Sequence, residues 1–466
     1  MSALVTDQFR ILNASNFVES FSDEKNSYYI TVGLPNPTIV GYGRSNTWNT
    51  NPPAPIDNLD YNSHSGDVAM FGRRVTGSNV RRLVRRIDYV QGNRYEMYRN
   101  DYSILNPAPL TNASRLYDAN YYVMNEDFRV YICIENGSTG DNPKGNVSQD
   151  QPKFTDLEPS KAGDSGDGYI WKYIFTVSPS DIVKFDSTEY ITVPNDWGTS
   201  TDPQIRSVRE AADSDINDNQ IKTVFIQDGG GNYANGIGQE MDIIGDGSGG
   251  KVRVDGVGGK ITNTVVTTGG KGYSYAMVDL GAINSNSTGT PAHLVPIIPP
   301  SKGHGYDIYK ELGADKVLMY ARFDNSSYDF ADDTIFAQVG IVKNPTILNS
   351  DTVFTDNQFS SLYSVKYETQ SSAQDLSVGD TIQQTVGVGS TAKGIVASYD
   401  TETKIIKYYQ DRSLYYNSST GDETDATDVR SRSPIINFTS SANAITKSGG
   451  SFSVNVDQNF SGVTTT

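Results

Sequence analysis

Residues 166–175 read Gly-Asp-Gly-Tyr-Ile-Trp-Lys-Tyr-Ile-Phe, and the fold of the surrounding chain is expected to form around this stretch. The first three residues tolerate positive φ or bond to their own backbone, which predicts a tight turn. The next seven are mostly aromatic or β-branched, which favours a strand. Alternate side chains of a strand face opposite sides, so four aromatic residues share one face, and we expect that face to be buried. These residues are Tyr169, Trp171, Tyr173 and Phe175.

The residues after this strand predict a short helical turn and then a second strand. Residues 178–181, Ser-Pro-Ser-Asp, are typical of the start of a helix. Residues 190–193, Tyr-Ile-Thr-Val, again favour a strand, and Pro194 ends it because proline cannot donate to a strand ladder. Upstream, residues 121–135 are aromatic and β-branched and read as one buried strand.

Length and composition bound the fold class. The chain has 466 residues, which is too long for a single hydrophobic core. Its 43 glycines and 29 tyrosines, with only 7 methionines, favour strands over helices. We therefore predict a mainly β, multidomain protein, made of β-sandwich and meander modules with a few short helices.

Charge and cysteine content narrow the function classes. The formal net charge of −17 argues against a nucleic-acid partner, because neutralising phosphates requires clustered lysine and arginine. The one cysteine, Cys133, excludes an internal disulfide framework, fits a reducing cytoplasm and is expected to be a small buried hydrophobe. Residues 1–13 have no signal-peptide pattern, and no apolar run is long enough to span a membrane. We expect a soluble chain with no membrane insertion.

One basic cluster interrupts this acidic sequence between residues 68 and 90. It consists of Arg73, Arg74, Arg81, Arg82, Arg85 and Arg86. We interpret these arginines as partners of the chain's own carboxylates or of a neighbouring subunit, since a guanidinium group pairs well with carboxylates.

An internal repeat with a period of forty runs through residues 221–300. Ile221 aligns with Ile261 and Tyr233 with Tyr273. The glycine pair at 229–230 aligns with the pair at 269–270, and residues 251–254 align with 291–294. Each unit reads as a strand, a glycine-rich turn that ends in tyrosine, a second strand and a return strand. Two such units predict one small β-sandwich or barrel.

Domain boundaries follow from the repeat, its polar flanks and the turn residues downstream. Strands predicted at 378–382, 392–398 and 404–409 form a three-strand meander. We expect five segments: an N-terminal core domain (1–210), an inserted glycine-rich two-repeat β-module (211–300), a continuation of the core (301–366), a small β-meander module (367–412) and a C-terminal segment that returns to the core (413–466).

Several apparent chemical motifs lack residues that they need. Gly245–Lys251 has the spacing of a phosphate-binding loop, but Val252 follows in place of Ser or Thr and the downstream pattern is strand. Asp213, Asp215 and Asn217 begin like a calcium loop, yet the required glycine and glutamate are absent. The histidines have no metal-ligand spacing and read as loop or packing residues; they are His64, His293 and His304. We expect no cofactor, no metal site and no small-molecule substrate.

Carboxylates near the aromatic strand leave an enzyme as the alternative. Asp164, Asp167 and Glu189 flank aromatic residues, and polysaccharide-cleaving proteins use two acids beside such residues. An aspartate between two glycines is also ordinary turn composition. An acidic pair around a deep open cleft would favour the enzyme, whereas bonding to turn amides would favour a scaffold.

The order of these motifs resembles one protein family. The Gly-Asp-Gly-Tyr turn, the aromatic strand and the later Glu-Tyr-Ile-Thr-Val-Pro strand are similar to those of the baseplate wedge subunits that gene 8 encodes in T4-like contractile-tailed phages. Further stretches that match are 29–33 with Trp48 and the prolines at 52, 53 and 55, then 84–89, 130–133, 336–345 and 432–435. The resemblance covers about 25–205 and 301–350 well, the C-terminus weakly and 206–300 not at all.

The resemblance implies a structural, non-enzymatic subunit of a phage tail baseplate. It would be located in the virion, assembled in the host cytoplasm, homodimeric and in contact with other wedge subunits. It would take part in baseplate rearrangement on infection. A tail-associated polysaccharide-binding or polysaccharide-cleaving protein is the alternative. The residues that carry the family motif, with a structural role, are Gly166, Asp167, Gly168, Tyr169, Trp171, Tyr173, Phe175, Glu189, Tyr190 and Pro194.

Overall fold

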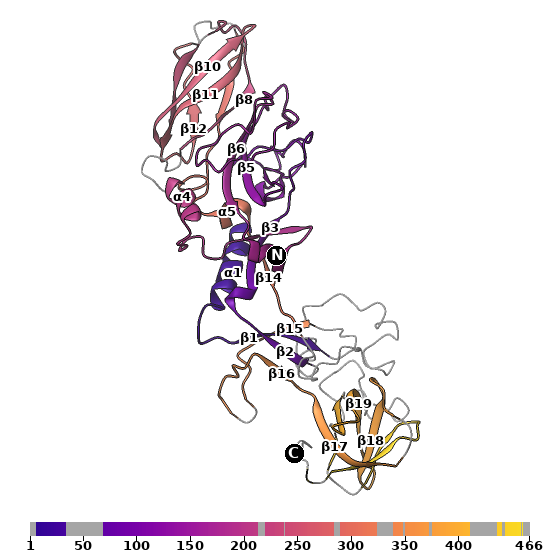
Figure 1. Cartoon of the computed structure of the whole chain (residues 1–466). Coiled ribbons are helices and arrows are strands. Elements are labelled where there is room, and N and C mark those ends of the chain that lie inside the picture. The colour runs from indigo at the N-terminus through magenta and orange to yellow at the C-terminus, as the bar shows by residue number, and fades with distance from the viewer. Residues whose placement is uncertain are drawn as a thin grey trace. The chain divides into compact units, whose positions relative to one another are not determined.

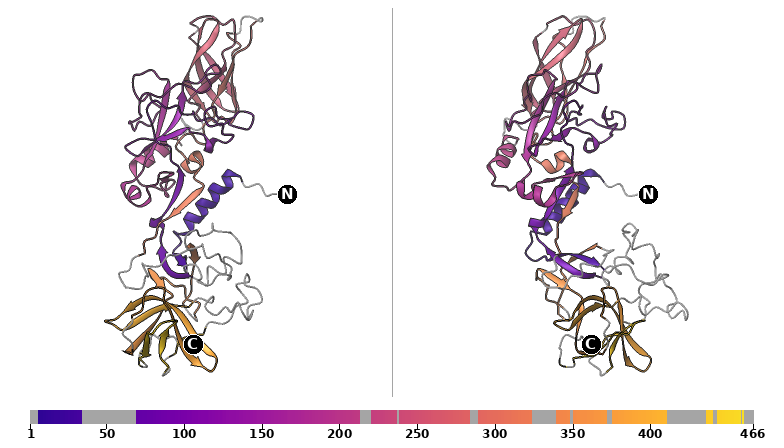
Figure 2. Two further views of the ribbon diagram at one scale, coloured as in Figure 1. Left: turned by 90° about the vertical axis from the view of Figure 1, so that its right-hand side faces the viewer. Right: turned by 45° about the vertical axis from the view of Figure 1, so that its right-hand side comes forward.

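The structure, a computed structural model, divides into two compact units. It describes residues 6–33, 69–212, 220–236, 238–283, 289–323, 339–347, 350–371, 375–410, 436–439, 443–457 and 459. One unit comprises 1–19 with 80–318, and the other comprises 20–79 with 319–466. The described elements, drawn in Figures 1 and 2, are mostly strands. The predicted mainly β, multidomain fold class is confirmed.

The predicted aromatic strand lies in the core of the first unit. It is β6 (Tyr169–Thr176), which pairs antiparallel with β5 (Arg129–Asn136), and β5 pairs with β4 (Tyr122–Met124). Gly166 and Gly168 of the preceding turn adopt φ of +73° and +82°, values that favour glycine. The four aromatic side chains are all buried, and Trp171 is 0% exposed. The predicted turn, strand and buried aromatic face are confirmed.

A second sheet of the first unit has the strand order β14-β3-β7. Its strands are β14 (Lys316–Met319), β3 (Val80–Arg85) and β7 (Tyr190–Val193). The predicted helical turn before β7 is α3 (Pro179–Phe185), which the Ser178 hydroxyl caps by accepting from the Asp181 amide at 3.2 Å. The other helices in the described ranges are α1 (Asp7–Ser20), α4 (Pro203–Ala212) and α5 (Ile308–Leu312), with 3₁₀ turns at Gly77–Asn79 and Leu116–Asp118.

The prediction of one strand over residues 121–135 is wrong. The chain turns at Asn125–Phe128, between β4 and β5. The Asn125 side-chain oxygen accepts hydrogen bonds from the amides of Asp127 (3.0 Å) and Arg129 (2.9 Å), and Phe128 takes a positive φ of 57°. A short polar run therefore suffices to reverse the chain between two buried strands.

The glycine-rich module, residues 221–298, has its own hydrophobic cluster within the first unit. One sheet has the order β11-β10-β9-β12, and the second pairs β13 with β8. The strands are β8 (Val224–Asp228), β9 (Gln239–Gly245), β10 (Ser248–Val257), β11 (Lys260–Lys271), β12 (Ala276–Val278) and β13 (His293–Pro296).

The two repeats of this module meet through reciprocal contacts. The Ile221 amide donates to the Gly269 carbonyl at 3.0 Å, and the Ile261 amide donates to the Gly229 carbonyl at 2.8 Å. The glycines that follow, at 230 and 270, adopt φ of +67° and +65°. These pairs confirm the predicted repeat over its first half.

The predicted alignment of the return strands is wrong by two residues. The Tyr273 hydroxyl accepts from the Gly250 amide and the Tyr233 hydroxyl from the Ala292 amide, each at 3.0 Å. Ala292 therefore corresponds to Gly250, so residues 251–254 do not match 291–294. The second repeat carries two more residues between its tyrosine and its return strand than the first.

The second unit contains a four-stranded sheet and a closed six-stranded barrel. The sheet has the order β15-β1-β2-β16, with β15 (Val339–Lys343), β1 (Tyr28–Gly33), β2 (Ala69–Val75) and β16 (Gln358–Ser360). Around the barrel come β17 (Tyr363–Gln370), β20 (Ile405–Tyr409), β19 (Ser390–Asp400), β18 (Thr381–Gly387), β21 (Ile445–Lys447) and β22 (Ser453–Val456). The predicted meander strands are β18, β19 and β20, and they form half of this barrel.

The two units group the chain differently from the five predicted segments. β1 and β2 belong with the second unit, because they pair with β15 and β16 from residues 339–360. In the barrel, β17 crosses the predicted boundary between 366 and 367, β18 to β20 come from the segment 367–412, and the last two strands come from the C-terminal segment. Independent folding of the predicted segments stays a prediction.

Candidate functional site

The Asp167 carboxylate, a candidate catalytic acid, is bound by backbone amides. Its two oxygens accept from the Tyr169 amide at 3.0 Å and the Gln149 amide at 2.8 Å. The Asp167 carbonyl accepts from the Asn146 side-chain amide at 2.9 Å. This bonding to turn amides is what we expected of a scaffold, and it gives Asp167 a structural role in holding the turn before β6.

The aromatic residues of β6 do not form the wall of a binding site. Tyr169 stacks on Trp171 with ring centroids 5.4 Å apart, and Tyr95 meets Trp171 edge-on at 5.8 Å. All three rings belong to the main core cluster of the first unit. The Trp171 ring nitrogen is buried and has no hydrogen-bond partner among the described residues. These rings therefore stabilise the core and cannot stack against a sugar.

The remaining motif residues, at 189–194, lead to a different part of the first unit. The Pro194 carbonyl accepts from the Tyr309 hydroxyl at 2.6 Å. Glu189 and Tyr190 line a pocket together with Arg85 and Arg86 of the predicted arginine cluster. The fold thus brings two predicted motifs, 84–89 and 189–194, to one site, and the turn around Asp167 does not line it.

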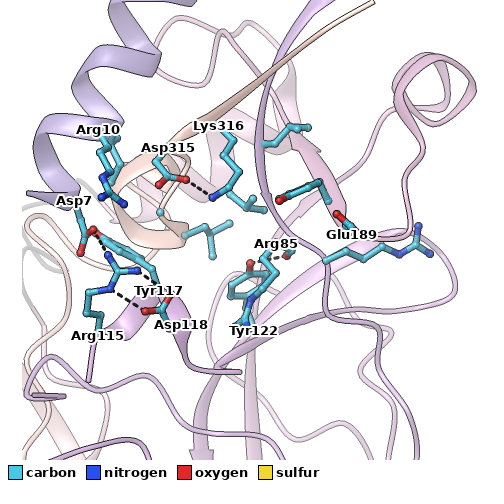
Figure 3. A pocket seen from close by; sticks show the side chains of 17 residues that line it. Asp7, Arg10, Arg85, Arg115, Tyr117, Asp118, Tyr122, Glu189, Asp315 and Lys316 are labelled. Carbon is cyan, nitrogen blue, oxygen red and sulfur yellow. Dashed lines mark hydrogen bonds and ion pairs between the residues drawn. The ribbon is translucent and has the colours of Figure 1, made fainter. Parts of the chain in front are cut away.

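This arginine pocket has a volume of about 440 Å³ and is drawn in Figure 3. Five segments far apart in the sequence form its walls: helix α1, the end of β3, the 3₁₀ turn near 117, the start of β7 and the loop after α5. Its lining residues are Asp7, Arg10, Ile11, Leu83, Val84, Arg85, Arg86, Arg115, Tyr117, Asp118, Tyr122, Glu189, Tyr190, Leu312, Gly313, Asp315 and Lys316.

Most charges in the arginine pocket are already paired inside the protein. Arg115 contacts Asp7 at 2.6 Å and Asp118 at 2.8 Å, and Lys316 contacts Asp315 at 2.9 Å, as the dashed lines in Figure 3 show. The hydrogen bond to Asp118 raises the pKa of Arg115. Paired charges on a surface contribute little stability, so these pairs mainly lower the net charge of the wall.

Two tyrosines on the pocket wall are also held in place. The Tyr122 hydroxyl donates to the Arg85 carbonyl at 2.6 Å, and the Tyr117 hydroxyl donates to the Lys310 carbonyl at 2.6 Å. Burial raises the pKa of Tyr117 to about 12 and raises that of Tyr122 as well, so both remain protonated at neutral pH. The lining contains no cysteine, histidine or serine, and its possible acids and bases are the carboxylates, among them the candidate acid Glu189, together with Lys316.

The arginine cluster follows the interpretation made from the sequence only in part. Arg81 pairs with Asp181 at 3.0 Å, and Arg86 pairs with Asp88 and Asp186. Arg82 is almost fully buried, with its Nη2 3.7 Å from Glu19 Oε1 and its guanidinium carbon 3.9 Å from the centre of the Tyr309 ring. The interpretation does not describe Arg73 and Arg85, which donate to the Gln358 side chain and to the Ala119 carbonyl. No sequence signal separates a buried arginine from its exposed neighbours, since both occur in the same run.

The motifs set aside in the sequence are structural where the structure describes them. Gly245–Lys251 joins β9 to β10, so it turns between two strands and does not open a helix. The buried His304 lies with its Nδ1 2.5 Å from Glu311 Oε1. His293 lies on β13, and Cys133 is buried, which raises the pKa of its thiol.

Several predicted features lie outside the described residues. These are His64, the residues 213–217, the matches at 48–55 and 432–435, and part of the match at 336–345. Within the described ranges, no group of three or more His, Cys, Asp or Glu could hold a metal ion. The helices in those ranges are too short or too polar to span a bilayer.

Comparison with known proteins gives one distant relative. The chain is 25% identical over 221 residues to the baseplate wedge protein gp8 of Enterobacteria phage T4. The match covers 41% of this chain and 60% of the phage T4 protein, which is less than two thirds of that relative's length. No family model matches the chain. The similarity indicates a distant relationship between the two chains.

Proposed function

We propose that this chain is a structural subunit of a phage tail baseplate, in the wedge, and that it has no catalytic activity. The similarity to the phage T4 baseplate wedge protein carries the proposal. The structure is consistent with it, because the candidate acid Asp167 is occupied by turn amides and the aromatic residues of β6 are core residues.

The finer parts of the proposal concern how such a subunit works. It links neighbouring wedge proteins in a contractile tail, forms a homodimer and takes part in baseplate assembly and in rearrangement on infection. It is assembled in the host cytoplasm. Its mechanism is binding, so its surfaces and not a reactive centre carry the function. Permanent interfaces of this kind bury about 2,000 Å² or more.

The arginine pocket gives this mechanism a concrete form. Its walls come from five segments and contain the ion pairs of Arg115 and the hydrogen bonds of Tyr117 and Tyr122. A rigid, polar concave surface binds a partner segment with little loss of side-chain freedom. We propose that a wedge partner docks at this pocket.

The experiment is quantitative mass spectrometry of virions and of baseplates isolated from the phage that carries the gene. The chain should be enriched in the baseplate fraction at a fixed whole-number ratio to the other wedge proteins. Recombinant protein should release no sugar from host polysaccharide. Absence from purified virions, or polysaccharide cleavage that Asp167→Asn abolishes, would overturn the proposal.

A further inference from the structure

Residues 103–106, here called the tip, place two large aliphatic side chains in solvent. Ile104 is 86% exposed and Leu105 is 96% exposed. Single exposed aliphatic residues are common on protein surfaces, but two adjacent ones at the end of a loop form a protruding apolar contact.

Hydrogen bonds close the tip on both sides of its two aliphatic residues. The Ser103 amide donates to the Asn106 carbonyl at 3.0 Å, and the Asn106 amide donates to the Ser103 carbonyl at 3.2 Å. The Asn106 side-chain amide donates to an Asp101 carboxylate oxygen at 3.0 Å. The two aliphatic residues are therefore held between closed backbone bonds, and little freedom remains to be lost on binding.

The base of the tip is tied to the interior of the first unit. Arg99 donates to both Asp101 oxygens at 2.8 and 2.6 Å, and its guanidinium carbon lies 4.2 Å from the centre of the Phe225 ring. The Tyr102 hydroxyl donates to the Met97 carbonyl at 3.0 Å. A chain of contacts thus connects the exposed tip to the core.

The same unit also contains a pocket whose lining includes apolar and aromatic side chains. This pocket of about 340 Å³, here called the tyrosine pocket, has apolar and aromatic walls from Tyr98, Leu116, Tyr117, Pro300 and Tyr306. Pockets of about 300 Å³ and larger accommodate ligands of several heavy atoms. Charged residues also line it, at 302, 307, 310 and 311. The apolar part of this lining can contact aliphatic side chains, and the charged part can contact the polar residues around them.

The tip and the tyrosine pocket belong to neighbouring segments. The Ile298 amide donates to the Asn100 side-chain oxygen at 3.1 Å, which ties the segment that leads to Pro300 to the one that leads to the tip. A contact about a two-fold axis uses the same surface of both copies, so a knob and a pocket on one patch can be exchanged reciprocally.

We propose that two copies of this chain bind each other by inserting the Ile104–Leu105 tip of each into the tyrosine pocket of the other. The inference deepens the proposed function, on which it rests, by assigning residues to the homodimer contact. The exchanged tips bury far less than the roughly 1,200 Å² of a standard interface, so they anchor a larger contact.

The first test measures the dimer dissociation constant by analytical ultracentrifugation of the full chain. Leu105→Asp, which puts a charge at the anchor, should raise this constant on the order of 100-fold, because the two-fold contact loses two anchors at once. Val183→Asp is the matched control, since Val183 on α3 is also 86% exposed. The control should leave the constant unchanged, and both variants should keep the wild-type circular dichroism spectrum, which reports folding independently of dimer affinity.

The second test uses disulfide trapping, because the native Cys133 is fully buried. Leu105→Cys protein mixed with Ser301→Cys protein should form a disulfide between the two chains under mild oxidation. This trapping also decides the matter if Leu105→Asp fails to fold.

Either of two results would overturn the assignment: a wild-type chain that stays monomeric, or a dimer that neither Leu105→Asp weakens nor the cysteine pair traps. If the dimer neither weakens with Leu105→Asp nor is trapped by the cysteine pair, the proposed baseplate role still stands, since that role is measured independently in virions.

Discussion

The core around β6 and the glycine-rich module are both antiparallel, but they are stabilised by different residues. The β6 core relies on large rings, with Trp171 fully buried among tyrosines. The module relies on close backbone contacts at paired glycines, which its two repeats use reciprocally. A substitution that removes volume should therefore damage the first region most, and one that adds a single Cβ should damage the second.

Trp171→Ala should have the largest effect. Replacing a buried tryptophan with alanine removes its packing and leaves a cavity, at a cost of about 3 to 5 kcal/mol. This is a large fraction of the stability of an ordinary domain, so the variant should be insoluble or should melt well below the wild type. Calorimetry would show the loss in the transition of the β6 core.

A Trp171→Ala protein with an unchanged melting temperature that fails only in assembly would contradict the buried position of this side chain. Tyr275→Ala is a suitable control, because Tyr275 is 65% exposed.

Gly270→Ala should destabilise the module. Gly270 adopts φ of +65°, and a Cβ there would lie 2.6 Å from the Gly250 amide nitrogen and the Ser248 carbonyl oxygen. Positive φ and a backbone clash together should cost about 2 to 3 kcal/mol.

Gly272→Ala is the matched control for that change. Gly272 also has positive φ, at +74°, but a Cβ there meets nothing within 4 Å. It should cost only about 1 kcal/mol, from backbone strain alone. Urea unfolding would separate the two variants, and equal losses would show that contact between the repeats contributes nothing.

The stability of the β6 core should depend on pH through Lys172. Its side chain is buried and donates to the Leu157 carbonyl at 2.6 Å, and burial lowers its pKa to about 8. In the unfolded chain the pKa of a lysine is about 10.4. Between a pH of about 8 and a pH of about 10.4 the unfolded chain therefore binds more protons than the folded chain, so the free energy of unfolding rises with pH in this range.

The measurement compares wild type with Lys172→Met. Between about pH 7.5 and about pH 9.5 the free energy of unfolding of the wild type should rise by roughly 2 kcal/mol relative to that of the variant. The comparison removes the contribution of tyrosines, which titrate in both proteins. If the free energies of unfolding of the two proteins change equally with pH, the pKa of Lys172 is not lowered by burial.

Shortening the module should have the smallest effect on the β6 core. Phe225 and Ile297 reach from the module into the main core cluster, so they have to be retained. Asp228 pairs with His293 at one end of the β8–β13 ladder, and an Asn-Gly turn in place of the residues between them would close a hairpin. The shortened chain should stay soluble and lose about 1 kcal/mol or less from the core transition. Aggregation would show that the core depends on the module.

The sequence predicted what local residues determine, and missed what distant segments determine. The turn at 166–168, β6 and the equivalence of Tyr233 with Tyr273 follow from residue type and spacing. The grouping of β1 and β2 with β15 and β16 does not, because strand pairing across hundreds of residues leaves no local pattern. The arginine pocket was missed for the same reason, since five separate segments build it.

The proposed role of this chain as a structural baseplate subunit is tested most directly by a cryo-electron microscopy map of the intact tail. Density for the chain is expected in every wedge of the baseplate, in two copies, with Ile104 and Leu105 at the contact between them. A baseplate map with all its wedge density accounted for by other proteins would contradict the claim.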